Sequence, residues 1–374
     1  MTLTKVNPEM LVSPGRNLLH NGDMRINQMG TQTGVGATSN TVSACDRFNY
    51  STLSSASGRL TSSREAATGG VDGHSYWLKS LYTTADASPS SLEAQFINNP
   101  MEDGDVQRYL LAADGTLLAH MVSFDVIAHI DGASSITFPA KMGLAVRASG
   151  STERQYVADV TIAAADTWER VSVAVPTDAT VDNIANNVGG TYSISFGLYG
   201  GSGRKSSTGA WEASGTDVSV AGDNWADATN NYIGITNVKV EVGSTATDFE
   251  SPVASTELNH CQRFWQSSYD MGVTPGTVTD VGRENRMIGL DASNQNYFRV
   301  NYPVVMRTSS TPDVTIYTPS AGTAAKYDNE TDTAEIAITL VEADAKGFTI
   351  RPTSGTNQNL GDWITFHWTA NERN

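Results

Sequence analysis

The chain has 374 residues, a length that fits two domains better than one. Its 40 acidic and 24 basic residues give a net charge of −16, which argues against nucleic acid as a partner because phosphate backbones require clustered Lys and Arg. No apolar stretch approaches the ~20 residues of a membrane helix, and the first residues lack the apolar core of a secretion signal. We therefore expect no membrane insertion, and synthesis in a reducing cytoplasm with Cys45 and Cys261 unpaired.

Residues 1–16 are poor in apolar side chains and contain two prolines, Pro8 and Pro14. This composition suits a segment that packs no core of its own. We predict a docking arm that contacts a neighbouring protein. A frayed terminus is the alternative.

From Asn17 to about Pro252, alternating apolar and polar residues predict one strand after another, with Gly, Asn and Asp turns between them. The stretches Asn17–Gln28 and Tyr232–Glu250 are predicted to hold the first and last strands of one sandwich. In the later stretch the alternation changes parity, which predicts a β-bulge at Thr236–Asn237. Helical spacing predicts one short helix over Asp105–Ala112.

After Pro252 the period changes to that of a helix. Four apolar residues step by +4, +3 and +4, which predicts an amphipathic linking helix over 253–268. An exposed stripe of this size also suits packing around a threefold axis, so we expect a homotrimer with contacts at Ala254, Leu258, Cys261 and Trp265. Residues 269–374 return to strand alternation and predict a second, smaller β-sandwich.

Six segments in chain order carry a resemblance to a known family: Asn17–Gln28 (NLLHNGDMRINQ), Cys45–Phe48 (CDRF), Ile235–Glu250 (ITNVKVEVGSTATDFE), Cys261–Gln266 (CQRFWQ), Pro303–Tyr317 (PVVMRTSSTPDVTIY) and Phe366–Arg373 (FHWTANER). The chain resembles the fibre and receptor-binding structural proteins of tailed bacteriophages, whose jelly-roll modules resemble carbohydrate-binding modules. The resemblance implies an all-β virion protein: docking arm 1–16, jelly-roll sandwich 17–252, linking helix 253–268 and C-terminal β-sandwich 269–374. Residues 1–16 would dock on another virion protein.

The resemblance directs attention to host surface glycan as a ligand. Sugars stack on aromatic rings, and their hydroxyl groups bind short amide and carboxylate side chains. The polar loop Gly200–Asn231 and the residue after it supply both kinds, so the candidate glycan-binding residues are Trp211, Trp225, Asn224, Asp227 and Tyr232. The alternative is that the two tryptophans only anchor a long loop. For Trp77 and Trp168 we expect packing roles.

Calcium often lies beside the first and last strands of carbohydrate-binding jelly rolls, and Asp23 and Glu241 could provide oxygen ligands. A cofactor is otherwise not expected. The six histidines are scattered and none belongs to a nucleophile turn, so we expect no enzymatic activity. Two alternatives to a short tail fibre stay open: a head fibre or capsid decoration protein without a receptor role, and a polysaccharide-degrading fibre.

Overall fold

The computed structural model describes residues 15–37, 40–54, 56–67, 74–112, 114–149, 153–179, 192–213, 218–289, 296–307, 311–330, 334–353 and 359–372. Most of the predicted docking arm, residues 1–14, lies outside these ranges. The chain forms two compact units. The jelly-roll unit comprises the described residues up to Arg25 together with Gln32–Pro252, and the C-terminal unit comprises Ile26–Thr31 together with Val253–Asn374.

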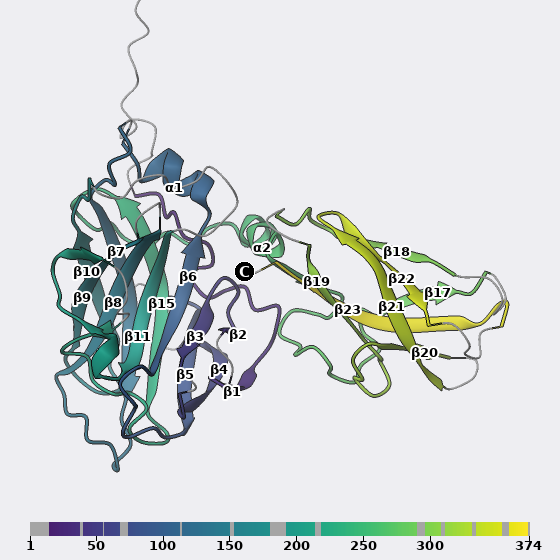
Figure 1. Cartoon of the computed structure of the whole chain (residues 1–374), viewed down its shortest axis with the longest axis horizontal. Helices are drawn as coiled ribbons and strands as arrows, with labels where there is room; N and C mark the ends of the chain where they lie inside the picture. The colour runs from purple at the N-terminus through teal and green to yellow at the C-terminus, as the bar shows by residue number, and fades with distance from the viewer. Residues whose placement is uncertain are drawn as a thin grey trace, which may run out of the picture. The chain divides into compact units, whose positions relative to one another are not determined.

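The jelly-roll unit consists of two antiparallel sheets (Figure 1). The six-stranded sheet has the order β1 (Gln32–Val35), β4 (Arg59–Ala66), β5 (Tyr76–Thr84), β15 (Tyr232–Val242), β7 (His120–His129) and β10 (Glu169–Val175). The seven-stranded sheet has the order β13 (Trp211–Ala213), β9 (Glu153–Ile162), β8 (Ala140–Ser149), β11 (Tyr192–Gly200), β6 (Ala94–Met101), β3 (Asn49–Leu53) and β2 (Asn40–Val42). Short elements complete the unit: α1 (Asp103–Tyr109), a 3-10 turn (Ser202–Arg204) and the pair β12 (Lys205–Ser206) and β14 (Val218–Ser219).

The core of this unit lies between the two sheets, because each strand directs alternate side chains inward. Strand β7 follows the predicted alternation, with Val122, Phe124, Val126 and Ala128 fully buried. Phe124 meets Phe196 of the opposite sheet edge-to-face, with ring centroids 4.9 Å apart. The short helix expected over Asp105–Ala112 is also confirmed as α1, which begins two residues earlier and ends three residues earlier.

The predicted bulge in β15 is confirmed. Its register against β7 shifts between Thr236 and Lys239, and Asn237 has a left-handed φ of 49°. One extra residue at this point restores the inward orientation of the strand, so that Val238 and Val240 continue the buried face begun by Ile233 and Ile235.

The segment Asn17–Gly22 lies beside β15 as expected. The prediction of a strand over Asn17–Gln28 is wrong, because no strand forms there and the end of this stretch, from Ile26 on, belongs to the C-terminal unit. The Leu18 N–H donates to the Val240 carbonyl at 2.8 Å, and the Val238 N–H donates to the Gly22 carbonyl at 2.9 Å. Between these bonds the Asn17 side chain donates to the Val238 carbonyl and accepts from the Val240 N–H, each at 3.0 Å. Left-handed φ angles at Asn21 (58°) and Met24 (57°) prevent an extended backbone here.

The C-terminal unit is a smaller β-sandwich. It contains α2 (Ala254–Gln262) and β16 (Trp265–Ser267), β17 (Glu284–Met287), β18 (Phe298–Asn301), β19 (Asp313–Tyr317), β20 (Lys326–Asn329), β21 (Ala334–Asp344), β22 (Gly347–Pro352) and β23 (Trp363–Asn371). Four strands pair with β23, namely β16, β17, β19 and β20, so this last strand organises the unit. Its inward residues Ile364, Phe366 and Trp368 join a core with Phe348 and Ile350. The predicted all-β fold is confirmed.

The predicted trimer contact needs correction. Helix α2 ends at Gln262, before Trp265, which instead begins strand β16. Cys261 and Trp265 are buried within their own chain, so neither side chain is available to a second copy. Of the four residues, Ala254 is exposed and Leu258 is half-buried.

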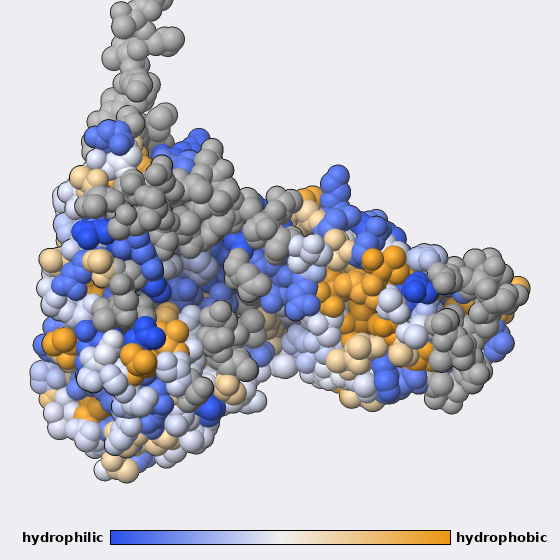
Figure 2. All heavy atoms as spheres, in the orientation of Figure 1, coloured by the Kyte–Doolittle hydropathy of each residue, from blue (hydrophilic) through white to orange (hydrophobic). Residues whose placement is uncertain are grey.

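The C-terminal unit exposes large apolar side chains. Figure 2 shows hydrophobic residues gathered on the visible face of the unit that carries β18–β23. Exposed large hydrophobic side chains of this unit include Met287, Leu340, Val341 and Trp363. Within the described residues, no helix is long and apolar enough to cross a membrane.

The buried His120 predicts acid sensitivity of the jelly-roll unit. Its Nδ1–H donates to the Leu118 carbonyl at 2.9 Å, and its Nε2 accepts from the Tyr192 hydroxyl at 2.5 Å. Burial lowers the pKa of His120 from 6.5 to about 4, because the charged ring would be desolvated. As the pH falls, His120 is protonated in the unfolded chain before it is protonated in the folded chain. The contribution of His120 to the unfolding free energy is therefore fully present above pH 6.5 and declines as the pH falls toward 4.

We expect the wild type to lose about 2 kcal/mol more unfolding free energy between pH 7 and pH 5 than a His120→Gln variant. Urea titrations of the full chain, followed by hydrogen exchange of β7 and β11 peptides, measure this difference. If the unfolding free energies of the wild type and the variant depend on pH in the same way, His120 is not the source of the acid sensitivity.

Candidate ligand-binding surface

The structure places Trp225, one of the predicted glycan-binding residues, in the protein core. Its side chain is fully buried, and its Nε1–H donates to the Lys141 carbonyl at 3.2 Å. Neighbouring Asn224 donates to the Asp86 carbonyl at 2.7 Å. The expectation that the Trp225 ring faces a sugar is therefore wrong, because a long polar loop needs an apolar anchor and this ring provides it.

Of the other predicted glycan-binding residues, Trp211 and Asp227 anchor loops and Tyr232 lies on the surface. Trp211 is half-buried against the core and donates from Nε1 to the Pro176 carbonyl at 2.9 Å. The Asp227 carboxylate accepts hydrogen bonds from Ser134, Ser135 and Asn231, so it fixes one loop to another. Tyr232 lies elsewhere, on the outer face of the six-stranded sheet.

The two predicted calcium ligands are engaged by protein groups. Asp23 pairs with Arg25 at 3.1 Å. The Glu241 carboxylate lies 3.3 Å from the Lys239 ammonium group and accepts from the N–H and the hydroxyl group of Thr247 at 2.7 and 2.6 Å. Within the described residues these two carboxylates do not belong to a common group of metal ligands.

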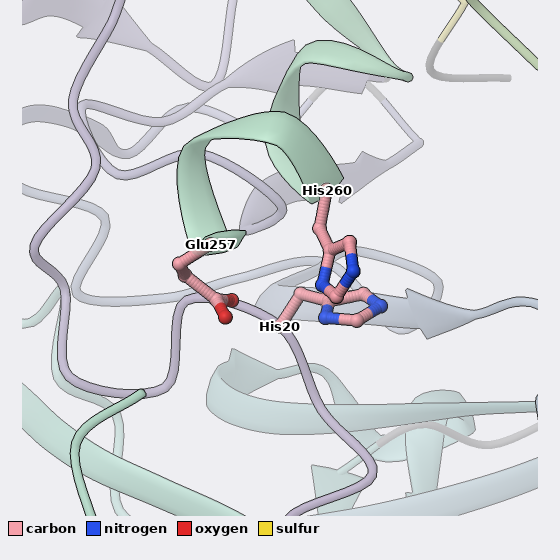
Figure 3. Close-up of side chains that lie close together, drawn as sticks. All are labelled: His20, Glu257 and His260. Carbon is pink, nitrogen blue, oxygen red and sulfur yellow. The ribbon is translucent and has the colours of Figure 1, made fainter. Parts of the chain in front are cut away.

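Two further side chains that could bind a metal ion lie on helix α2. Figure 3 shows Glu257 and His260 one helical turn apart, both directed to the same side of α2. His20, the third side chain in that figure, belongs to the jelly-roll unit. We assign no metal site to these residues.

An arc of five aromatic rings lies on the outer face of the six-stranded sheet. The rings belong, in order, to His129, Tyr232, Trp77, Trp168 and His74, and successive ring centroids are 5.2, 6.0, 5.6 and 4.6 Å apart. The Tyr232, Trp77 and Trp168 rings are not part of the hydrophobic core between the sheets, and the His74 side chain at the end of the arc is fully buried. We call these five residues the aromatic platform.

Strands β5, β15 and β7, which lie side by side in the sheet (Figure 1), provide Trp77, Tyr232 and His129. His74 lies just before β5, and Trp168 lies just before β10. Tyr232 and His129 are direct cross-strand partners, and their rings stack at an angle of 12°. Trp77 lies across Gly234, where a Cβ atom would come within 2.4 Å of the indole ring. Glycine at this strand position therefore lets the indole lie against the backbone.

Polar groups hold the exposed end of the platform. The Asp166 carboxylate, whose side chain is 55% exposed, lies 2.9 Å from Nδ1 of His129 and accepts a hydrogen bond from the Tyr232 hydroxyl at 3.1 Å. Partial burial and the nearby Asp166 charge raise the pKa of Tyr232 to about 12. The phenol therefore stays protonated at neutral pH and donates to Asp166.

A buried charged group supports the other end. The Asp125 carboxylate lies 3.7 Å from Nδ1 of His74 and accepts hydrogen bonds from Asn237 at 2.7 Å and Arg170 at 3.1 Å. Burial raises the pKa of Asp125, and the Arg170 charge opposes this shift. This network holds the His74 ring against Trp168.

Comparison with known proteins gives only remote similarities. No family model and no curated protein matches the chain. Similar solved structures include the enzymatically active domain of tailspike protein 4 of bacteriophage CBA120 (11% identity, TM-score 0.29), TmCBM61 in complex with β-1,4-galactotriose (12%, 0.26) and the tandem domain CBM22-1–CBM22-2 of Paenibacillus barcinonensis Xyn10C (9%, 0.29). The matches cover 62, 61 and 96% of this chain and 22, 99 and 99% of those chains. At these TM-scores no functional conclusion follows.

Tyr232 is the one platform residue among the candidates predicted from the sequence. The packing roles expected for Trp77 and Trp168 are confirmed, since the two rings pack on each other and Trp77 also packs on Tyr232. The alternation of β5 indicates that Trp77 faces outward. Leu78 is buried, so its two neighbours Trp77 and Lys79 point to the opposite face of the strand. The contact between Trp77 and Trp168 joins β5 to the loop before β10, and no spacing along the chain reveals it.

We expect Gly234→Ala to disorder the platform while the core stays intact. The added methyl group would lie within 2.7 Å of both the Trp77 ring and Ile127, so the indole must move away from the sheet. Tryptophan fluorescence and proton NMR of the indole N–H groups would report this movement. Gly132→Ala is the matched control, because no atom lies within 4 Å of its added Cβ. Equal spectra for the two variants would contradict the expectation.

Proposed function

We propose that this chain is a virion surface protein that binds host surface glycan through the aromatic platform of its jelly-roll unit. In this proposal it acts as a short tail fibre or receptor-binding fibre, with residues 1–16 docking on another virion protein. The sequence segments that resemble phage fibre proteins support the virion assignment. The observation that carries glycan binding is the arc of five rings on the outer face of the six-stranded sheet.

The platform has the chemistry that a sugar requires. Ring faces receive the apolar C–H faces of pyranoses, and polar groups at the edge bind hydroxyl groups. Trp77, Trp168, Tyr232 and His129 are each half-buried or partly exposed, so they are held in place without being enclosed. Rings fixed in advance lose little conformational entropy on binding, which favours affinity.

We further propose that the role is binding and not catalysis. Retaining and inverting glycosidases use two carboxyl groups that flank the scissile bond. At the platform, Asp166 is bonded to His129 and Tyr232, and Asp125 is fully buried in a network with Arg170. Both carboxylates therefore position rings and cations.

Replacing Trp168 or Tyr232 by Ala should weaken attachment to host envelope polysaccharide about tenfold, since one stacked ring contributes about 1–1.5 kcal/mol. Surface plasmon resonance on immobilised polysaccharide and pull-down with host cells would measure the change. The control is Leu92→Ala, which removes an apolar side chain, 55% exposed, from the jelly-roll unit outside the platform.

Three outcomes would contradict the proposal in different ways. Normal attachment by folded platform variants would exclude the platform as the glycan site. Absence of glycan binding by the wild type would favour the head-fibre or decoration alternative. Release of new reducing ends from the polysaccharide would favour the polysaccharide-degrading alternative.

We also propose a homotrimer whose contacts include the exposed apolar residues of the C-terminal unit. Val341, beside the bulge of β21, is 44% exposed next to exposed Leu340. A charge at a buried apolar contact is strongly unfavourable, so Val341→Glu should shift the chain from trimer to monomer. Light scattering measures the mass, with Val220→Glu on the jelly-roll unit as the control. A wild-type chain that is monomeric at micromolar concentration would contradict this proposal.

A further inference from the structure

Lys79 is the cation of the aromatic platform. It lies on the outer face of β5, opposite Ser63 of β4 and Gly234 of β15. Its ammonium group is 4.5 Å from the centroid of the Tyr232 ring and 6.0 Å from that of Trp77. Because Gly234 has no side chain, this neighbour on β15 offers Lys79 no side-chain charge and no side-chain hydrogen-bond acceptor.

The charged side chains at the platform differ in whether a protein group pairs with them. Asp166 has two protein donors, His129 and Tyr232, and Arg170 is paired with Asp125. Across the described residues, by contrast, no carboxylate lies within 4.0 Å of the Lys79 ammonium group. Arg59, Arg64 and Lys205 also lack a carboxylate within this distance, but each donates to a backbone carbonyl, which Lys79 does not do among the described residues.

We propose that Lys79 is a specificity residue that selects acidic sugars, such as uronic acids, whose ring stacks on the platform while the carboxylate pairs with the ammonium group. This inference rests on the proposed glycan-binding function and names the class of its ligand. Contact with two rings confines the ammonium group to their faces, beside the surface on which a pyranose would stack. A carboxylate at this place gains a charge-assisted hydrogen bond.

The net charge of the protein makes this selectivity testable. At −16 the chain repels polyanions at long range, so a preference for the acidic form of a polymer cannot come from nonspecific attraction. Any such preference must come from a local cation. Added salt screens the long-range repulsion but affects a close, partly desolvated pair much less.

The experiment compares each of three uronic-acid polymers (alginate, polygalacturonate and hyaluronan) with the same polymer after chemical reduction of its carboxyl groups. Binding of the full chain is measured by surface plasmon resonance at 150 mM salt. We expect reduction to weaken wild-type binding about tenfold for at least one polymer. Lys79→Met, which keeps the apolar stem, should bind both forms equally, whereas Lys79→Arg should keep the preference. Lys205→Met, at a half-buried lysine outside the platform, is the control variant and should behave as the wild type.

The outcomes separate this inference from the proposed function. Equal wild-type binding to acidic and reduced polymers overturns the role of Lys79 but leaves glycan binding intact, and so does a preference that survives in Lys79→Met. Binding confined to neutral host polysaccharides and lost in Trp168→Ala also overturns the inference alone. If the wild type binds no polysaccharide, the proposed function and the inference both fail.

Discussion

Strand β15 is buried along nearly its whole length, so each of its backbone N–H and C=O groups must find a partner on one of two edges. Strand β7 pairs with one edge from end to end. The other edge is shared, because β5 pairs with Tyr232–Ile235 and the segment Asn17–Gly22 bonds to Val238 and Val240. The bulge at Asn237 marks the change of partner. The beginning of the jelly-roll unit thus closes its last strand without being a strand itself.

The same strand organises the outer face of the sheet. Where β5 is its neighbour, Tyr232 and Gly234 point outward and form the floor of the aromatic platform. Beyond the bulge the outward residues are Lys239 and Glu241, a buried ion pair whose members also bond to Thr247. Charges buried in this way need such hydrogen bonds to offset their desolvation. One half of the outer face is therefore closed by its own ion pair, and the other half presents rings.

The aromatic residues of the unit perform two physically different tasks. Trp225 and Trp211 each donate an indole N–H to a backbone carbonyl and pack on the core, which is how a long polar loop is fixed to a sandwich. Trp77 and Trp168 instead pack on other rings and on a glycine outside the core. A ring held by its neighbours keeps a face for a ligand, whereas a ring sealed in the core does not. The proposed site follows from this difference in surroundings, since the residue types are the same.

The sequence by itself determined the all-β class, the positions of most strands, the bulge in β15, helix α1 and the start of α2. Each of these depends on interactions between residues close in the chain, which leave a period of 2 or 3.6 in the pattern. The tertiary structure alone decided which tryptophans are buried, that Cys261 and Trp265 lie inside their own chain, and that Asn17 replaces a strand partner by its side chain. It also decided the platform, whose rings come from β5, β7, β15 and the segments just before β5 and β10. Contacts between strands distant in sequence depend on sheet order and register, and alternation within each strand specifies neither.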